Sequence, residues 1–215
     1  MKAFLSLILF FSIGFVGYAQ QDYPDSGFTN KAEAKNLMVN GLKEGKWLEY
    51  VNIVFDGIEN ETTDTNAEYY YLTVYKFGNR YGIRRKYRKN RTLEVEYPDN
   101  DNKRNWVIKW YHENGKLKAE QPFTDSGLNG IEKDYYETGE LEYEIPYFNN
   151  MVKGIFKGYY KNGNIREEVS YLGRGWEIDE AKNYYENGKV KSETVFYRSG
   201  DKVIKNFDEN GNEIK

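Results

Sequence analysis

The sequence contains few residues that could carry out catalysis or hold a metal ion. It has 215 residues, none of them cysteine and only one, His112, histidine. A thiolate nucleophile, a disulfide and a cysteine-based zinc site are therefore excluded, and a His-ligated metal site or Ser-His triad is not expected. The paired carboxylates Glu167-Glu168 and Asp179-Glu180 would point to opposite faces of a strand, so neither pair can share a reacting group. We expect a protein that is not an enzyme and uses no metal and no cofactor.

Aromatic side chains are the residues best suited to bind a ligand. The chain has 21 tyrosines, of which Tyr136, Tyr160 and Tyr185 recur at equivalent places in a repeated pattern, with His112 in register. Spaced one repeat apart on the same face, they would form a row that can stack on sugars or on a partner protein. Trp176 is a second candidate contact, because it replaces the usual loop residues of the pattern. The alternative is that tyrosine simply favours exposed strands and that His112, one ring substituted for another, is a structural or surface residue.

The charge balance gives no reason to expect a nucleic-acid partner. The chain carries 31 Lys and Arg against 34 Asp and Glu, a formal net charge of −3. Nucleic-acid binding depends on a basic excess that neutralises phosphates.

Residues 1–19 have the pattern of a cleavable signal peptide. Met1-Lys2 gives a basic start, residues 3–16 form an apolar run, and Gly17-Tyr18-Ala19 places small residues where a signal peptidase cuts. The alternative is a membrane anchor, but the run is shorter than the roughly 20 apolar residues of a spanning helix. We expect cleavage before Gln20 and a secreted or periplasmic protein that is not transmembrane after cleavage.

The rest of the chain repeats itself about every 24 residues. Turn glycines recur at Gly115, Gly139, Gly163, Gly188 and Gly211, with spacings of 24, 24, 25 and 23, and Arg91 stands one interval before the first. Four residues before this position is the tyrosine column: Tyr87, Tyr111, Tyr135, Tyr159, Tyr184 and Phe207. Six residues before it is the lysine column: Arg85, Lys109, Lys133, Lys157, Lys182 and Lys205. Five residues after it is the glutamate column: Glu96, Glu120, Glu144, Glu168 and Glu193.

Each repeat has the chemistry of a β-hairpin. Asn-Gly pairs supply the positive φ of tight hairpin turns, and they lie between segments rich in Tyr, Val, Ile and Phe. The helical alternative needs apolar residues at a spacing of 3.6 without a glycine turn in each repeat, and no such stretch follows Val39. The pattern predicts an all-β protein built from tandem hairpins, whose turn glycines and tyrosine column are structural.

Two hairpin registers are compatible with the columns. A two-residue turn places the lysine column opposite the glutamate column, whereas a three-residue turn with a bulge pairs the tyrosine column with the aliphatic residue two positions after the glycine. We favour the second, because it gathers a mostly apolar face, although it leaves the lysine column on that face. In one repeat that face would consist of Ile131, Tyr135, Leu141, Ile145 and Tyr147.

The domain organisation follows from where the repeat begins. Residues 20–39 are polar and are expected to form an exposed lead-in segment with a short helical turn at 32–36, and residues 40–215 form the repeat domain. If Tyr50 belongs to the tyrosine column, 13 extra residues separate it from Tyr87, and we place them in a long loop near 56–68.

The columns resemble the MORN-type repeat, in the variant found in bacterial YwqK-family antitoxins. The segment Gly154–Glu168 fits this pattern at Gly154, Lys157, Tyr159, Tyr160, Asn162, Gly163, Ile165 and Glu168. The resemblance covers roughly residues 40–215 and implies an elongated single-layer meander of hairpins. MORN repeats are linked to protein scaffolding and membrane-surface association, and the antitoxin name implies binding to a toxin protein and blocking it.

Two functional hypotheses result. The first is an exported protein-binding module or scaffold, antitoxin- or immunity-like as a special case, whose partner is a toxin or an envelope component. The second is a cell-surface carbohydrate-binding protein that uses the row of Tyr136, Tyr160 and Tyr185.

Overall fold

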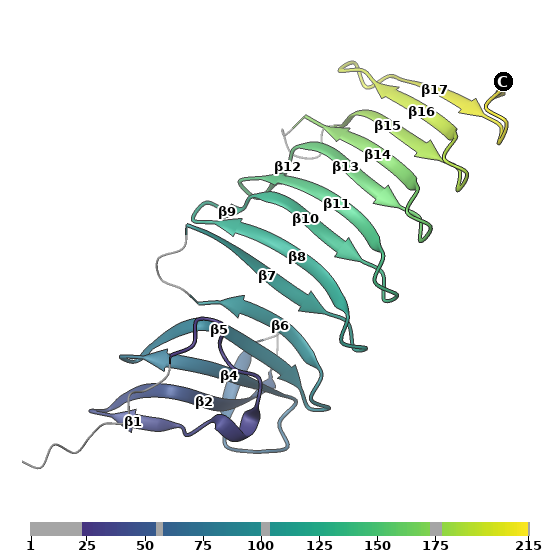
Figure 1. The fold of residues 1–215 in the computed structure, drawn as a ribbon. Coiled ribbons are helices and arrows are strands. Elements are labelled where there is room, and N and C mark those ends of the chain that lie inside the picture. Colours follow the sequence, from purple (N-terminus) through teal and green to yellow (C-terminus); the bar gives the residue numbers. More distant parts are fainter. Residues whose placement is uncertain (1–22, 55–57, 100–103, 173–177, 215) are drawn as a thin grey trace, which may run out of the picture.

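The computed structural model describes residues 23–54, 58–99, 104–172 and 178–214. These residues form one antiparallel sheet of 18 strands, whose successive hairpins lie side by side in chain order (Figure 1). In the described part of the chain the helical structure is a single 3-10 turn, η1 (Lys31–Glu33), and no helix is long and apolar enough to cross a membrane. The predicted all-β hairpin meander is confirmed.

The strands of the N-terminal half are β1 (Leu37–Val39), β2 (Leu42–Ile53), β3 (Glu59–Thr62), β4 (Tyr69–Lys76), β5 (Asn79–Arg88), β6 (Leu93–Pro98), β7 (Asn105–Tyr111), β8 (Leu117–Thr124) and β9 (Gly127–Leu128). Those of the C-terminal half are β10 (Gly130–Tyr135), β11 (Leu141–Phe148), β12 (Met151–Val152), β13 (Gly154–Tyr159), β14 (Ile165–Tyr171), β15 (Ile178–Tyr184), β16 (Val190–Phe196), β17 (Lys202–Phe207) and β18 (Glu213–Ile214). Short strands such as β9 and β12 close the ends opposite the glycine turns.

The glycine turns have the predicted bulged geometry. In the β10–β11 hairpin the Tyr136 N–H donates to Glu140 O at 2.9 Å, and the Gly139 N–H donates to Tyr136 O at 2.8 Å. The turn glycines have φ values between +82° and +102°, a region that L-residues enter at a cost. Arg91 holds the same position at +71°, so the first turn keeps the shape without the glycine.

The register combines the two alternatives. Tyr135 pairs with Leu141, as the bulged turn requires, but Asp134 then pairs with Tyr143 and leaves Glu142 as an extra residue on β11. One step further, Lys133 is opposite Glu144, so the lysine and glutamate columns also face each other. The same shift occurs in the other glycine-turn hairpins, β5–β6, β7–β8, β13–β14 and β15–β16.

The predicted apolar face is wrong for this reason. The extra residue reverses the alternation of the outgoing strand, so Ile131, Tyr135 and Leu141 share one face, whereas Ile145 and Tyr147 lie on the other. Because residues 23–36 pack on the first of these faces, we call it the lead-in face and the other the opposite face. The lysine and glutamate columns belong to the lead-in face.

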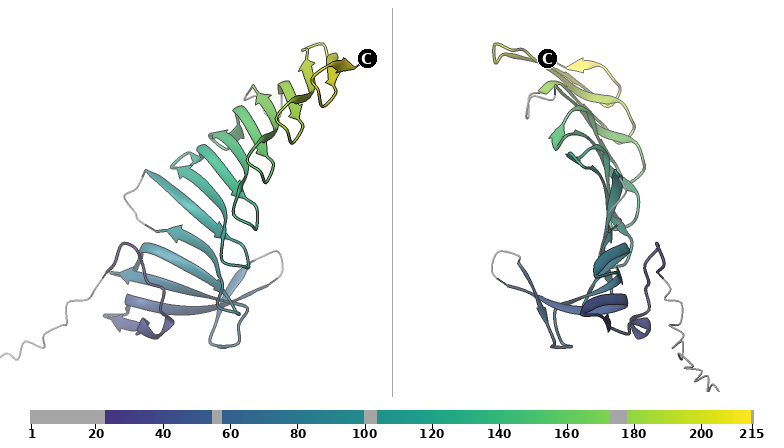
Figure 2. Two further views of the ribbon diagram at one scale, coloured as in Figure 1. Left: turned by 45° about the vertical axis from the view of Figure 1, so that its right-hand side comes forward. Right: turned by 90° about the vertical axis from the view of Figure 1, so that its left-hand side faces the viewer.

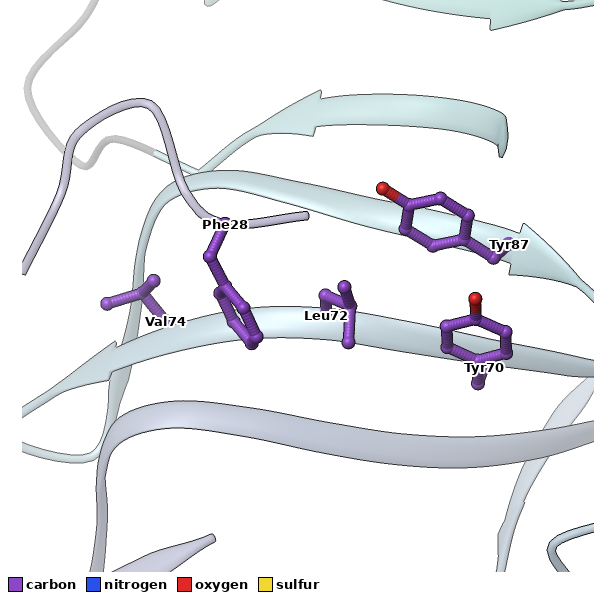
Figure 3. Close-up of a cluster of buried hydrophobic side chains, with 5 residues drawn as sticks. All are labelled: Phe28, Tyr70, Leu72, Val74 and Tyr87. Atoms are coloured by element: carbon purple, nitrogen blue, oxygen red, sulfur yellow. The ribbon is translucent and has the colours of Figure 1, made fainter. Parts of the chain in front are cut away.

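The buried core lies at the N-terminal end, under the lead-in segment. Phe28 packs against Tyr70, Leu72, Val74 and Tyr87, each 9% exposed or less (Figure 3). Most of residues 25–36 are exposed, but Gly27 and Phe28 are buried against the sheet, and η1 lies close to the predicted helical turn. Phe28 anchors the segment, because burying its ring is worth about 2–3 kcal/mol.

Strand β3 departs from the expected loop near 56–68. Its residues pair with the end of β2, from Tyr50 opposite Thr62 to Ile53 opposite Glu59. Figure 2 shows β2 and β3 bending to one side of the curved sheet while the lead-in lies on the other. The carboxylate of Glu59 reaches the opposite face, where it accepts from Tyr71 Oη at 2.7 Å. Residues 1–19, the predicted signal peptide, lie outside the described residues.

Replacing Arg91 with glycine is expected to stabilise the sheet. The φ of +71° costs an L-residue about 1–2 kcal/mol, of which the greater flexibility of glycine in the unfolded chain cancels roughly half. Arg91→Gly should raise the free energy of unfolding by about 0.5–1 kcal/mol in urea titrations. Gly163→Ala is the matched test. A Cβ at this position meets nothing within 4 Å, so the change costs only the backbone strain of the positive φ. Gly163→Ala should lower the free energy of unfolding by about 1 kcal/mol. A change of the same sign in both variants would contradict the left-handed turn position assigned to Arg91 and Gly163.

Candidate interaction surface

The lysine and glutamate columns form one continuous row across the lead-in face. Strand pairing places each lysine from Lys109 to Lys182 between a glutamate of its own hairpin and one of the preceding hairpin. At the two ends of the described row, Arg85 faces the single glutamate Glu96, and Lys205 faces the single glutamate Glu193. Within hairpins the cation–carboxylate distances are 2.7 Å for Arg85–Glu96, 3.4 Å for Lys109–Glu120 and 3.8 Å for Lys157–Glu168. Alternating charge is favourable at each contact and leaves the row without a net sign.

The tyrosine column ties each hairpin to the preceding one through the same glutamates. The hydroxyl donates to the glutamate of the preceding hairpin in Tyr111–Glu96 (2.7 Å), Tyr135–Glu120 (3.1 Å), Tyr159–Glu144 (2.8 Å) and Tyr184–Glu168 (2.7 Å). Burial and the nearby carboxylate raise the pKa of Tyr135 to about 12, so the phenol stays a donor at neutral pH. Each glutamate from Glu96 to Glu168 thus accepts from a tyrosine of the following repeat while it faces a cationic side chain on both sides.

The row predicted to bind a partner or glycan also links neighbouring repeats. Tyr136 donates its hydroxyl to Tyr159 O at 2.7 Å, Tyr160 to Tyr184 O at 2.7 Å and Tyr185 to Phe207 O at 2.9 Å. His112 occupies the same place, with Nε2 at 2.8 Å from Tyr135 O. Each ring is half-buried. Its polar atom hydrogen-bonds to a carbonyl of the next repeat, at a point where the backbones of the two neighbouring hairpins no longer pair with each other. The structure therefore brings these four residues into a structural series of links between repeats.

Trp176, the other predicted contact, lies outside the described residues.

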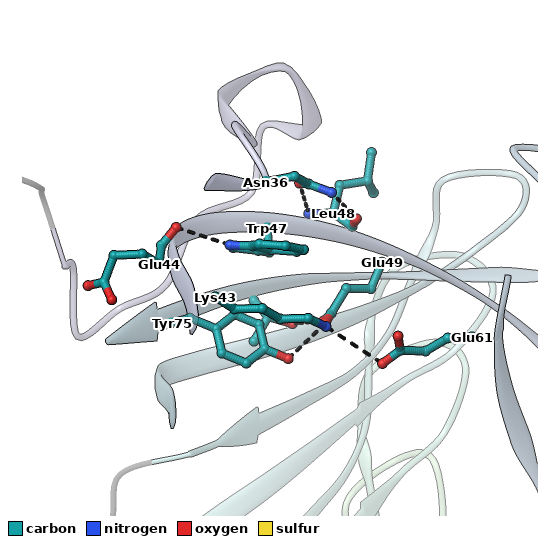
Figure 4. Close-up of polar contacts among 9 residues, drawn as sticks. Asn36, Lys43, Glu44, Trp47, Leu48, Glu49, Glu61 and Tyr75 are labelled. Carbon is teal, nitrogen blue, oxygen red and sulfur yellow. Dashed lines mark hydrogen bonds and ion pairs between the residues drawn. The ribbon is translucent and has the colours of Figure 1, made fainter. Parts of the chain in front are cut away.

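The densest polar cluster is on the opposite face, on β2 and β4 (Figure 4). Glu49, 9% exposed, accepts from Lys43 Nζ at 2.6 Å, Thr73 Oγ1 at 2.7 Å and Tyr75 Oη at 2.7 Å. Burial by itself would raise the pKa of Glu49, but these three hydrogen bonds hold it below its usual value. The carboxylate is thus fully engaged, and no group of three or more possible ligands among the described residues is placed to hold a metal ion.

An exposed aliphatic stripe remains on the lead-in face. Eight positions before the turn centre stand Val107, Ile131 and Ile155, which are 41%, 54% and 55% exposed on three successive repeats. Their cross-strand partners are Pro122, Pro146 and Ser170. At the same position in the first repeat Ile83 is half-buried, because the lead-in lies over it. The sequence pattern showed these residues as apolar but gave no sign that their face is uncovered.

Proline and glycine alternate along this stripe for a steric reason. A Cβ on Gly130 would lie 2.9 Å from Pro122 Cγ, and one on Gly154 would lie 3.4 Å from Pro146 Cγ. Both glycines also have positive φ, at +126° and +113°. Each hairpin can therefore approach the preceding proline closely, and the stripe continues across the junction between repeats.

Asp134, on the opposite face, gives a pH-dependent test of the register. Burial and the charges of Glu132 and Glu142 raise the pKa of Asp134 to about 6, against an opposing effect of Lys118. Because the folded pKa exceeds the ordinary value of 3.8, the ionised carboxylate costs stability, and that cost develops as the pH rises from 4 to 6. Asp134→Asn should therefore raise the melting temperature at pH 7.5 and change it much less at pH 4.

The matched variant is Glu120→Gln, which removes a carboxylate that faces Lys109 and accepts from Tyr135. It should lower the melting temperature at pH 7.5. A loss of stability in Asp134→Asn at pH 7.5 would contradict the environment given to this carboxyl group.

Comparison with known proteins agrees with the periodicity of the sheet. The family described as MORN repeat variant matches residues 107–125, 128–149, 153–172 and 180–199. No curated protein matches the chain. Among solved structures, the one titled "Crystal Structure of TarM" aligns with 65% of this chain and 21% of its own, at 13% identity and a TM-score of 0.28, so this chain spans about a fifth of that protein. Four segments in tandem between residues 107 and 199 thus match the MORN repeat variant.

Proposed function

We propose that this chain is a protein-binding repeat module whose partner docks on the aliphatic stripe of the lead-in face. One observation carries the proposal: Val107, Ile131 and Ile155 lie in line on successive repeats and are about half exposed. Contiguous exposed apolar surface is rare on proteins that have no partner. Beside the stripe runs the lysine–glutamate row, which would provide the polar rim of an interface.

The opposite face offers less apolar surface to a partner. Its aromatic side chains pack on one another, as Trp106 does on Phe123 with ring centroids 6.0 Å apart and Tyr143 does on Phe156 at 5.4 Å. Ile204 and Ile214 are large aliphatic side chains that stand about half exposed there, at 49% and 50%, on the last two strands. A partner that seeks apolar contact therefore gains more from the lead-in face.

The carbohydrate-binding alternative loses the feature on which it was based. The polar atoms of Tyr136, Tyr160 and Tyr185 are committed to backbone carbonyls of the next repeat. A sugar would compete with these links for the hydroxyls. We accordingly favour a protein partner and a role without catalysis.

The class of partner follows from the N-terminal pattern and the family resemblance. Residues 1–19 direct the chain out of the cytoplasm, so the partner is an envelope component or an exported toxin. In the second case the chain would act as an immunity protein, in keeping with the antitoxin name of the YwqK family. The stripe is the surface that would contact either partner.

Site-specific photo-crosslinking tests the docking surface. A benzoylphenylalanine introduced in place of Ile131 or Ile155 should capture one protein in stoichiometric yield from cells that make the protein naturally. The matched control is the same group at Ile204, which is similarly exposed but on the opposite face. Equal capture at Ile204, or none at Ile131 and Ile155, would overturn the proposed function.

Export can be tested independently. Expression of the full chain in a bacterial host should yield a periplasmic or secreted product. Its mass should be that of residues 20–215, and its N-terminal sequence should begin at Gln20. Ala19→Arg places a large charged residue at the cleavage position and should leave the uncut chain in the membrane fraction. A wild-type product that keeps Met1 in the cytoplasm would refute the signal peptide.

A further inference from the structure

We infer that the aliphatic stripe takes an extended peptide segment of the partner, in a polyproline II-like conformation with an apolar residue at every third position. This inference rests on the proposed function and specifies the form of the ligand. It is carried by the lead-in segment, which already lies on this face, and by the spacing of the stripe.

The lead-in, in which residues 27–30 are neither helix nor strand and join a turn to η1, shows how a chain segment crosses the strands of this face. Gly27 approaches β5 so closely that a Cβ would lie 2.0 Å from Ile83 O. The next residue, Phe28, lies over β4, and Asn36 exchanges two hydrogen bonds with the backbone of Leu48 on β2 (Figures 3 and 4). The segment thus runs across the sheet rather than along a strand, and a peptide on the stripe would follow the same direction over the later repeats.

Arg85 shows how the lysine column can hold such a segment. Its Nη1 donates to Ser26 O at 2.8 Å and Phe28 O at 3.2 Å, while its Nε donates to Glu96 at 2.7 Å. One cation therefore serves a glutamate of the sheet and two carbonyls of the crossing segment. An extended peptide keeps its carbonyls free to accept such bonds, whereas a helix has used them internally.

The lysines beside the stripe have room for the same contact. The side chains of Lys109 and Lys157 are 43% and 36% exposed, against 11% for Arg85 under the lead-in. An ammonium group has three donors, so each lysine can keep its glutamate and donate to a carbonyl of a bound peptide. Lys133 lies between them in the row, next to Ile131.

The spacing of the stripe selects the ligand's conformation. Equivalent residues of successive hairpins are two strands apart, or about 9.4–9.8 Å. Three residues of polyproline II advance about 9.3 Å and return to the same side of the helix, so residues i, i+3 and i+6 would fall on Val107, Ile131 and Ile155. A β-strand does not match, because its i and i+3 side chains point to opposite sides.

The stripe has defined ends. In the first repeat the corresponding Ile83 is already under the lead-in, and after Ile155 the position is held by Glu180. A shallow hollow beside Ile155 is lined by Ser170, Glu180 and Lys182, where apolar contact gives way to charge. The binding segment therefore has three apolar contacts.

Selection from a library of random linear 16-residue peptides displayed on phage, against the full mature protein, tests the inference. We expect enriched sequences with apolar residues at i, i+3 and i+6 and frequent proline between them. Synthetic peptides of these sequences should bind the wild-type protein in calorimetric titrations. Ile131→Ser should weaken binding about tenfold, since it removes about two buried CH₂ equivalents, and Lys133→Gln should weaken it severalfold. Ile204→Ser, an exposed change on the opposite face, should leave it unchanged.

The outcomes separate this inference from the proposed function. Enriched peptides with apolar residues at helical spacing, peptides insensitive to Ile131→Ser, or no enrichment would overturn the extended ligand. If photo-crosslinking at Ile131 and Ile155 still captured one protein, the docking surface would stand and the partner would present a folded surface. If crosslinking also failed, both proposals would fall.

Discussion

From β5 onward, each repeat of this sheet is held to the next by a glutamate that faces the basic residues of both. Glu144, for example, pairs with Lys133 of its own hairpin and Lys157 of the following one, and accepts from the Tyr159 hydroxyl. A single-layer sheet has no second layer against which a repeat could bury its side chains, so contacts between neighbours must supply its stability. Each ion pair contributes about 0–1 kcal/mol, but the series of tyrosine bonds adds buried aromatic surface at every junction.

The N-terminal end differs from the rest of the described sheet because one of its faces is covered. Leu72 and Val74 are fully buried beneath Phe28, whereas the residues of β17 are almost all exposed. Leu72 lies opposite Arg85, at the position where the later repeats have a glutamate. Because leucine replaces the glutamate here, this junction is apolar and accommodates the Phe28 ring. The lead-in therefore caps the array at a place where the row itself changes chemistry, as terminal repeats of such proteins commonly do.

The sequence was sufficient to predict the hairpins, their turns and the bulged pairing of Tyr135 with Leu141, because Asn-Gly turns and fixed columns depend on local chemistry. It was not sufficient to predict the faces. The extra residue of the bulge is Glu142 in one repeat and Lys118 or Arg166 in others, and such polar residues give no hydrophobic period by which a shift could be detected. The role of Tyr136 was hidden for another reason, since only the placement of the next hairpin reveals the carbonyl of Tyr159 that its hydroxyl satisfies.

The same row of charges explains how the chain can leave an aliphatic stripe uncovered. Lys133 and Glu144 stand immediately beside Ile131, and their counterparts flank Val107 and Ile155, so charged side chains border the stripe along its whole length. A narrow stripe bordered by alternating charges discourages broad association between flat apolar surfaces. It still fits a ligand that is itself one chain wide. The row that holds the repeats together therefore also restricts what can bind to them, and it does so through the cations that, in Arg85, already hold the lead-in.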